Sequence, residues 1–207
     1  YVHGLIVRTY AQSTLDELAH HASVPIINAL SDRFHPCQVL SDLLTISALT
    51  PDFSQLTIAW VGDGNNMVHS WINAACLLPF ELRVATPEGF PPDQTIVDRA
   101  LECGARLHVG HDPVQAVDGA DYINTDAWFS MGQEDEEEHR LQAFEGFQVN
   151  AGLLNTAGPK ARVLHCLPAH RGQEITDEVI EGPQSLVWEQ AENRLHMQKA
   201  LLEWIFS

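Results

Sequence analysis

Lysine is almost missing from this sequence of 207 residues, since Lys160 and Lys199 are the only two. Lysine and arginine together number 11 against 28 aspartates and glutamates, so the formal net charge is -17. Nucleic acids and anionic membranes are bound through clusters of positive charge, which this composition does not favour. We therefore expect neither nucleic acid nor membrane as a partner. Any bound anion has to be held mainly by arginine, histidine or backbone amides.

Closely spaced cysteines and long apolar runs are also lacking. No Cys-x-x-Cys motif is present, which argues against a zinc knuckle or a disulfide framework and for free thiols in a reducing cytoplasm. Apolar stretches such as residues 72–80 are far shorter than the roughly 20 residues of a membrane-spanning helix. The chain begins at Tyr1 without methionine or a signal-peptide pattern. We expect a cytoplasmic protein and a sequence whose beginning is missing.

What the sequence does contain is a regular alternation of strand-like and helix-like segments. Alternation of this kind is typical of βα units, with a parallel sheet covered by helices on both faces. The break at Thr50-Pro51-Asp52 divides the chain into the end of one α/β domain, residues 1–50, and a complete doubly wound parallel sheet domain, residues 51–207. The predicted strands are 4–9, 25–30, 56–61, 82–85, 106–109, 122–125, 163–166 and 186–188, and the predicted helices are 13–21 with Ser13 as N-cap, 36–49, 67–78, 93–102, 113–117, 136–144, 149–155 and 189–205.

Polar residues follow several predicted strands at the point where each strand ends. In an open parallel sheet, ligands bind beyond the carboxyl ends of the strands. We therefore expect these residues to gather in a single cleft. They are Arg8, the His35-Pro36-Cys37-Gln38 segment, the Gly62-Asp63-Gly64-Asn65-Asn66 turn, the residues from Thr125 to Gly132, and His165-Cys166-Leu167-Pro168.

Each of these motifs also has a plainer interpretation. The turn at residues 62–66 resembles the start of a dinucleotide fingerprint, but Met67 occupies the third glycine position, so a capped strand-to-helix turn explains it as well. His165 and Cys166 suggest a metal site, yet only His170 stands near them in the sequence, and we expect no zinc. Cys166 alone is compatible with a buried structural thiol.

Several large side chains near these motifs have no expected role in binding. Long charged side chains are mostly exposed, and tryptophans mostly pack in cores. We expect surface or loop-ordering positions for Arg33, Arg140, His170 and Arg171, and core positions for Trp60 and Trp128.

Taken together, the motifs resemble the ornithine carbamoyltransferases in identity and order, from Tyr1 to about Trp204. The Ser-Met-Gly and His-Cys-Leu-Pro pair resembles the ornithine-using branch and not its aspartate-using relatives. The family's Ser-x-Arg-Thr-Arg loop for carbamoyl phosphate does not occur in these residues, so we expect the chain to be inactive alone. The motifs are His35-Pro36-Cys37-Gln38, residues 62–66, Thr125-Asp126 with Ser130-Met131-Gly132, His165-Cys166-Leu167-Pro168 and Glu192-Asn193-Arg194.

The resemblance implies transfer of the carbamoyl group of carbamoyl phosphate to the δ-amine of L-ornithine, giving citrulline and phosphate. It implies neither a metal nor an organic cofactor, and it implies a homotrimer. Residues 1–50 would belong to the carbamoyl-phosphate-binding domain and residues 51–207 would form the ornithine-binding domain.

The resemblance also implies a role for each site residue. Arg8, His35 and Arg194 would face the developing oxyanion, and Asp126 and Cys166 would meet the δ-amine, with Cys166 as proton acceptor and not as nucleophile. Carbamoyl phosphate would be bound by Arg8, His35, Gln38, the Leu167 carbonyl and Arg194, and ornithine by Asn66, Asp126, Ser130 and the Met131 backbone.

Three other functions stay open from the sequence. The first is carbamoyl transfer to another amine, such as putrescine or N-acetylornithine, which a comparison of citrulline with other ureido products would distinguish. The second is a nicotinamide-dependent dehydrogenase built on the turn at residues 62–66, which NADH titration would test. The third is a non-catalytic interaction module.

Overall fold

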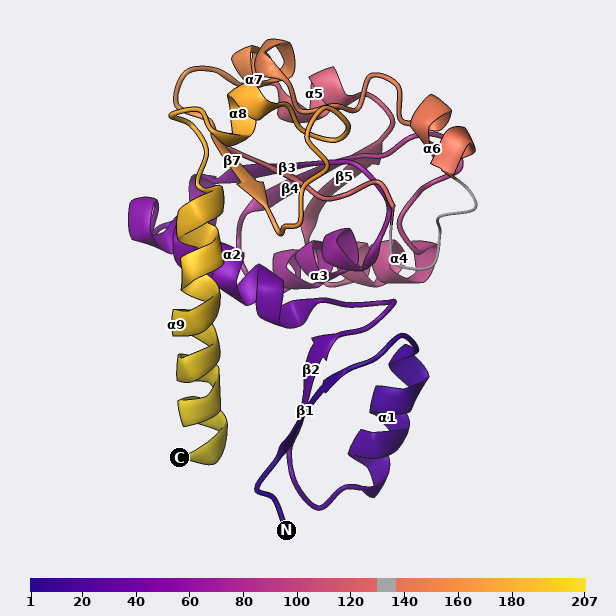
Figure 1. Ribbon diagram of the computed structural model, residues 1–207, viewed down its shortest axis with the longest axis vertical. Coiled ribbons are helices and arrows are strands. Elements are labelled where there is room, and N and C mark those ends of the chain that lie inside the picture. The colour runs from indigo at the N-terminus through magenta and orange to yellow at the C-terminus, as the bar shows by residue number, and fades with distance from the viewer. Residues whose placement is uncertain (130–136) are drawn as a thin grey trace.

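The computed structural model describes residues 1–129 and 137–207, which form two parallel sheets with helices packed on them (Figure 1). The smaller sheet has two strands, and the larger has five in the order β5-β4-β3-β6-β7. Every strand pair in both sheets is parallel, as the alternation of segments predicts. The strands are β1 (Leu5–Arg8), β2 (Ile26–Leu30), β3 (Thr57–Val61), β4 (Glu81–Ala85), β5 (Arg106–Gly110), β6 (Tyr122–Thr125) and β7 (Arg162–His165).

Helices cover both faces of the five-stranded sheet, so the predicted doubly wound α/β fold is confirmed. In Figure 1, α3 and α4 lie on the face that also receives α2, and α5, α7 and α8 lie on the opposite face. The helices are α1 (Gln12–His21), α2 (Pro36–Leu49), α3 (Asn66–Ala75), α4 (Gln94–Glu102), α5 (Pro113–Val117), α6 (Glu137–Ala143), α7 (Ala151–Ala157), α8 (Asp177–Ile180) and α9 (Val187–Phe206), with a 3-10 turn η1 (Phe53–Gln55).

The central strand β3 is buried along its whole length, and it separates two hydrophobic clusters. Trp60 packs with Trp71 and Phe80 on one face of the sheet. Trp128 packs with Phe144 on the other face. Trp60 is 0% exposed and Trp128 5%, which confirms both as core residues.

Strand order places a crevice beside the carboxyl end of β3. The chain proceeds from β3 outward to β4 and β5, then returns to the other side of β3 with β6. Such a reversal of strand order opens space between the loops that follow the two central strands. The loops that follow β3 and β6 are residues 62–65 and 126–129, and they carry two of the predicted site motifs.

The turn after β3 leaves no space for a side chain at Gly64. A Cβ atom on Gly64 would lie 2.3 Å from the Pro91 carbonyl carbon, so any other residue would push the two loops apart. The Gly64 N–H donates to the Phe90 carbonyl at 3.1 Å. This contact brings the loop after β4 over the crevice.

The last helix connects the two sheets. From β7, α9 runs back across α2 and down beside β1 and β2, so that both chain ends lie at the same end of the molecule (Figure 1). The Phe206 ring lies against Gly4, where a Cβ atom would come within 2.5 Å of it. Residues from the end of the chain therefore complete the surroundings of the first segment.

Three local expectations differ from the structure. The N-cap of α1 is Ala11 and not Ser13. The strand expected over residues 186–188 is wrong, because the Leu186 N–H donates to the Val163 carbonyl at 2.9 Å and the chain then turns into α9. The short helix α8 was not expected. Within the described ranges, no helix combines the length and apolar character that crossing a bilayer requires.

Candidate active site

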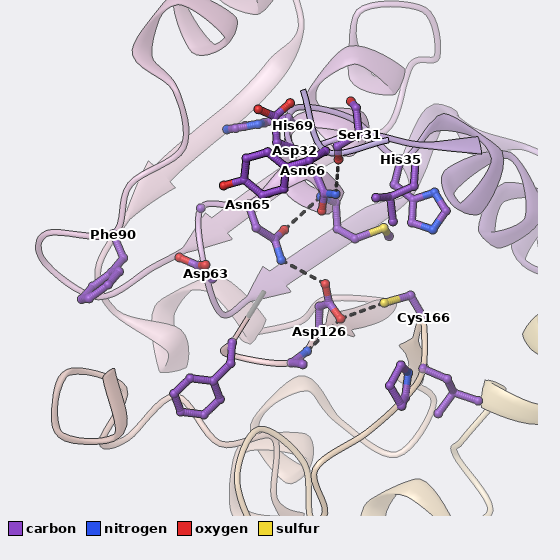
Figure 2. A pocket seen from close by; sticks show the side chains of 18 of the residues that line it. Ser31, Asp32, His35, Asp63, Asn65, Asn66, His69, Phe90, Asp126 and Cys166 are labelled. Atoms are coloured by element: carbon purple, nitrogen blue, oxygen red, sulfur yellow. Dashed lines mark hydrogen bonds between the residues drawn. The ribbon is translucent and has the colours of Figure 1, made fainter. Parts of the chain in front are cut away.

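A cavity of about 1010 Å³ opens where the carboxyl ends of both sheets face each other (Figure 2). Its size is at the upper end of the range usual for small-molecule sites, about 300–1,000 Å³. Both sheets contribute to its wall, as does the last helix. The predicted site residues that line it are Arg8, His35, Asn66, Asp126, Cys166, Leu167 and Arg194.

His35 lies at the N-cap position of α2 and is 6% exposed. Its backbone N–H donates to Ser70 Oγ at 2.7 Å, which connects α2 to α3. Burial, followed by the charges of Arg194 and Arg8, lowers the pKa of His35 to about 4. The imidazole is therefore neutral at pH 7 and has one N–H to donate, and its Nδ1 has no hydrogen-bond partner in the described part of the chain.

Gln38 lies behind the cavity wall and not on it. It is 1% exposed and does not line the cavity. Its Oε1 accepts a short hydrogen bond from the Arg194 guanidinium, and its Nε2 donates to Asp42 Oδ1 at 2.8 Å. The expected role of Gln38 as an acceptor for the carbamoyl nitrogen requires its Oε1 to be reachable from the cavity, and Gln38 is not among the residues that line it. In this structure Gln38 is a support for Arg194.

Asp126 is held by three donors at the end of β6. Its Oδ1 accepts from Cys166 Sγ at 2.8 Å and from the Ala127 N–H at 2.8 Å. Its Oδ2 accepts from Asn65 Nδ2 at 2.9 Å (Figure 2). The carboxylate is thereby fixed in orientation at the edge of the cavity.

Asn65 belongs to the turn expected at the cleft and performs two tasks, of which the sequence predicted only the cap. Its Oδ1 accepts from the backbone N–H groups of Met67 and Val68 and so caps α3, while its Nδ2 holds Asp126. An asparagine before an apolar helix is a recognisable N-cap signal. Met67 is 1% exposed and packs in the core, so the turn is a capped helix start and not a completed dinucleotide fingerprint.

Asn66 lines the cavity, but its side chain is engaged elsewhere. Its Nδ2 donates to the Ser31 carbonyl at 2.6 Å, in the loop after β2. The side chain thus joins the two sheets, and its Oδ1 is the atom left for a ligand. Ser130 and Met131, the other two residues expected to bind ornithine, lie outside the described residues.

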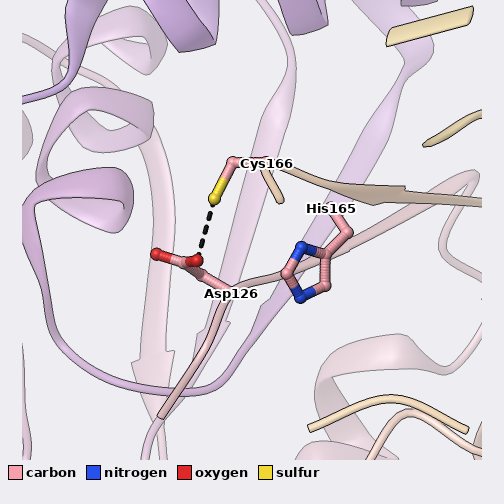
Figure 3. A group of neighbouring side chains, drawn as sticks. All are labelled: Asp126, His165 and Cys166. Atoms are coloured by element: carbon pink, nitrogen blue, oxygen red, sulfur yellow. Dashed lines mark hydrogen bonds between the residues drawn. The ribbon is translucent and has the colours of Figure 1, made fainter. Parts of the chain in front are cut away.

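The Cys166 thiol is a hydrogen-bond donor in this structure. Burial, together with the neighbouring charge of Asp126, raises the pKa of Cys166 well above its usual value. The sulfur therefore keeps its proton at neutral pH, whereas the expected role of proton acceptor requires a thiolate. Of the two groups that meet in Figure 3, the carboxylate of Asp126 is the better proton acceptor.

Asp126, His165 and Cys166 form the cluster in which a metal ion is conceivable, with one donor atom of each residue within 4.8 Å of the others (Figure 3). Both imidazole nitrogens are already engaged, however. His165 Nδ1 accepts from the Leu167 N–H at 2.9 Å, and Nε2 lies 3.1 Å from Glu174 Oε1. With a protonated thiol as the second group, this donor set fits a hydrogen-bonded network better than a metal centre.

Leu167 adopts a backbone conformation that is uncommon for a residue with a side chain. Its φ is 57°, and the bond to Pro168 is cis. The hydrogen bond from its N–H to His165 supports this conformation. The expected acceptor, the Leu167 carbonyl, belongs to a segment that lines the cavity.

A buried ion pair that sequence reasoning missed also lines the cavity. Arg140, expected at the surface, is 5% exposed, and its guanidinium donates to Asp63 Oδ2 at 3.0 Å and to the Trp128 carbonyl at 2.7 Å. Its guanidinium carbon lies 4.7 Å from the centre of the Phe90 ring. A carboxylate, a backbone carbonyl and an aromatic ring thus make burial of this arginine tolerable. Arg33 and Arg171, in contrast, form exposed ion pairs, as expected.

The cavity wall therefore contains two chemically different groups of residues. Arg8 and Arg194 lie near a neutral His35, and Asp126 is hydrogen-bonded to Cys166 and Asn65. A ligand pair with an anionic group on one member and an amine on the other fits this distribution of charge.

Two family models match the chain and together cover most of it. Residues 1–48 match "Aspartate/ornithine carbamoyltransferase, carbamoyl-P binding domain", and residues 54–205 match "Aspartate/ornithine carbamoyltransferase, Asp/Orn binding domain".

Curated relatives are named ornithine carbamoyltransferase. The protein of Nitratidesulfovibrio vulgaris is 56% identical over 207 residues, which are 100% of this chain and 69% of the relative. That of Oleidesulfovibrio alaskensis is 57% identical over 201 residues, which are 97% of this chain and 67% of the relative.

Solved structures agree with this grouping. The ornithine carbamoyltransferase of Gloeobacter violaceus is 51% identical with a TM-score of 0.90, and the match covers 98% of this chain and 69% of that one. The enzyme of Pyrococcus furiosus is 48% identical with a TM-score of 0.92, over 98% of this chain and 66% of that one.

Proposed function

The chain belongs to the aspartate/ornithine carbamoyltransferase family, and from this premise we propose that its cavity carries the transfer of a carbamoyl group from carbamoyl phosphate to the δ-amine of L-ornithine. The products are L-citrulline and phosphate. The observation that carries this proposal is a fixed carboxylate, Asp126, that lines the same cavity as Arg8 and Arg194.

Each of the two groups of residues has a task in this reaction. The amine nitrogen forms a bond to the carbonyl carbon of carbamoyl phosphate, and the bond from that carbon to the phosphate oxygen breaks with its electron pair. Arg8, Arg194 and the single N–H of neutral His35 stabilise the negative charge that develops on the carbonyl oxygen. The amine attacks in its neutral form, and one proton lost from it passes to Asp126. Phosphate leaves with the electron pair and takes up a proton to become hydrogen phosphate, and Asp126 releases its proton to solvent.

Cys166 and Asn65 are positioning groups for Asp126 in this scheme. Each donates a hydrogen bond to one carboxylate oxygen, so the carboxylate cannot rotate freely. These donors leave the carboxylate with an acceptor lone pair for the substrate. The Leu167 carbonyl is the proposed acceptor for the carbamoyl nitrogen, and Asn66 and, outside the described residues, Ser130 and Met131 are the proposed ornithine contacts.

Three features of the whole protein belong to the same proposal. Residues 1–50 serve carbamoyl phosphate and residues 51–207 serve ornithine, which the two family-model matches support. The protein is a homotrimer, as the family resemblance implies, and it works in the cytoplasm. Sedimentation of the full-length protein tests the expected homotrimer, and a monomer at micromolar concentration would contradict it.

The substrate is tested by comparing three amines in the same assay. The full-length protein receives carbamoyl phosphate with ornithine, putrescine or N-acetylornithine, and the ureido products are separated and quantified. We expect citrulline to exceed the other products by at least tenfold in kcat/KM. A preference for putrescine or N-acetylornithine would overturn the choice of substrate but not the transfer chemistry.

A parallel assay uses the 207-residue chain by itself. No Ser-x-Arg-Thr-Arg segment occurs among its residues, and a phosphate group is normally held by a helix N-terminus together with nearby arginines. We expect no citrulline and weak or absent binding of carbamoyl phosphate in calorimetry. Turnover equal to that of the full-length protein would mean that residues described above hold the phosphate.

A further inference from the structure

Asp42 is a fully buried carboxyl group to which the proposed reaction gives no task. It lies on α2, one helical turn after Gln38, and is 0% exposed. Its Oδ1 accepts from Gln38 Nε2 at 2.8 Å and from Gln190 Nε2 at 2.6 Å. Its Oδ2 lies 3.4 Å from Asn124 Nδ2. Burying a carboxyl group is costly unless it is well paired, so its position calls for an explanation.

The partners of Asp42 come from three different elements and lead to both groups of residues in the cavity wall. Gln38 on α2 accepts from Arg194 through its Oε1. Gln190 on α9 accepts, through its own Oε1, from the His165 N–H at 2.9 Å, next to Cys166. Asn124 on β6 lies two residues before Asp126. One carboxyl group therefore joins the supports of Arg194 with those of Cys166 and Asp126.

We propose that Asp42 is a positioning residue for carbamoyl transfer, whose carboxylate orients Gln38 and, through Gln38, the guanidinium of Arg194 at the cavity wall. This inference rests on the proposed function, because it assigns Arg194 to the carbamoyl end. A negative acceptor polarises the Gln38 amide more strongly than a neutral one, and this increases the negative partial charge on the oxygen that Arg194 contacts. Asp42 itself touches no substrate.

The ionisation of Asp42 controls the strength of this support. Burial raises the pKa of Asp42 to about 6, against the opposing effects of its hydrogen bonds from Gln190, Gln38 and Asn124 and of the charge of Arg194. The charged or titratable groups that act on it are Arg194 from α9 and Cys166 from the turn after β7; its other partners are amides. Protonation removes the anionic acceptor and weakens the support.

Asn124 makes the protonated state of Asp42 accessible without disruption. Its Oδ1 is buried and has no hydrogen-bond partner among the described residues. If this amide rotates by half a turn, that oxygen accepts from a protonated Oδ2 of Asp42. An Asp42→Asn variant can use the same contact, so it preserves both shape and hydrogen bonding while removing the charge.

The first experiment needs no substrate. Nuclear magnetic resonance on the 207-residue chain follows the Asp42 carboxyl carbon and the Arg194 Nε between pH 4.5 and 8. We expect both signals to titrate with a common midpoint near 6, and the Arg194 step to vanish in Asp42→Asn. An Arg194 signal that ignores the Asp42 titration in the wild-type chain would overturn the proposal, whether or not any variant folds.

The second experiment measures kinetics in the full-length protein with Ser41→Ala as the matched control. Ser41 neighbours Asp42 on α2 and is also 0% exposed, but its Oγ donates within its own helix, to the Cys37 carbonyl. We expect Asp42→Asn to raise the KM for carbamoyl phosphate about 10- to 100-fold, as loss of a charge-assisted hydrogen bond does. We expect a smaller change in kcat, and little change in Ser41→Ala.

The pH dependence of that KM separates positioning from a structural role. In the wild type, KM rises as pH falls through about 6, and in Asp42→Asn this step is lost; ionisation of carbamoyl phosphate itself is common to both proteins and cancels in the comparison. A variant with the KM and pH profile of Ser41→Ala would contradict the proposal. Absence of citrulline from the wild type, with intact coupling of the Asp42 and Arg194 signals, would overturn the proposed function alone.

Discussion

The Cys166 thiol donates a hydrogen bond to Asp126 Oδ1 at 2.8 Å, although the two residues are 40 positions apart in the sequence. The bond joins the loop after β6 to the turn after β7, two neighbouring strands of one sheet. The acidic partner raises the pKa of the thiol further than burial alone does. The pair therefore behaves as a protonated donor with a fixed acceptor, and this order of roles is open to direct tests.

Alkylation should distinguish Cys166 from an exposed cysteine. A thiol reacts as its thiolate, and the raised pKa of Cys166 leaves little thiolate at pH 8. We expect iodoacetamide to label the exposed Cys103 well before Cys166, as measured by mass spectrometry of digested protein over time. Labelling of Cys166 at the rate of Cys103 would show that the thiol ionises readily.

Asp126→Asn should preserve the fold and remove most of the turnover. The amide keeps the volume of the carboxylate but cannot take the proton of the attacking amine, and general-base roles contribute about 10²- to 10⁴-fold to rate. Ser130→Ala serves as comparison, because one hydroxyl contact to the substrate is worth about 0.5–1.5 kcal/mol. Equal losses of kcat in the full-length variants would refute the distinction between the two residues.

Arg140→Ala should destabilise the chain strongly. Its removal leaves Asp63 buried without its partner, and loss of one member of a buried ion pair typically costs about 3–5 kcal/mol. Arg171→Ala is the matched control, because its pairs with Asp177 and Glu181 are exposed and such pairs are worth about 0–1 kcal/mol. Urea unfolding at pH 7 measures both, and similar midpoints would argue against a structural role for Arg140.

His35 should make folding stability depend on pH in acid. Its folded pKa of about 4 lies below the ordinary 6.5, so between these values the unfolded chain binds more protons. Stability from this group is complete above pH 6.5 and is lost as pH falls toward 4, by about 3 kcal/mol in total. Asp42 acts oppositely, since its pKa is raised, so the test is the difference between wild type and His35→Gln in urea unfolding at pH 4.5 and 7. If the free energy of unfolding changed equally between pH 4.5 and 7 in both proteins, the lowered pKa of His35 would be contradicted.

Strand and helix positions could be predicted because local patterns determine them. The apolar run of β3 and the proline near the start of α2 are visible without any tertiary information. The beginning of α9 could not be predicted, because Leu186 makes a strand-like hydrogen bond to Val163 before the helix starts. The apolar pattern of residues 186–188 is compatible with a strand and with the start of a helix.

The site residues also divide into those that local sequence predicts and those that depend on distant partners. Asp126 and Cys166 follow predicted strands, so their meeting at one edge of the sheet follows from strand order. Arg140 could not be assigned, because its partners Asp63 and Phe90 are distant in the sequence and its helix looks like a solvent-facing one. Asp42 could not be assigned for the same reason, since the polar groups that satisfy it come from β6 and α9.

The packing of α9 against α2 has to be a late step when the chain folds during synthesis. Gln190 reaches Asp42 across 148 positions, and Arg194 reaches Gln38 across 156. Contacts that span so much chain form late, because a long loop has to close first. A ribosome has to translate nearly the whole chain before α2 meets its main helical neighbour. Until then Asp42 lacks the hydrogen bond from Gln190, and a pause before residue 187 would lengthen that interval.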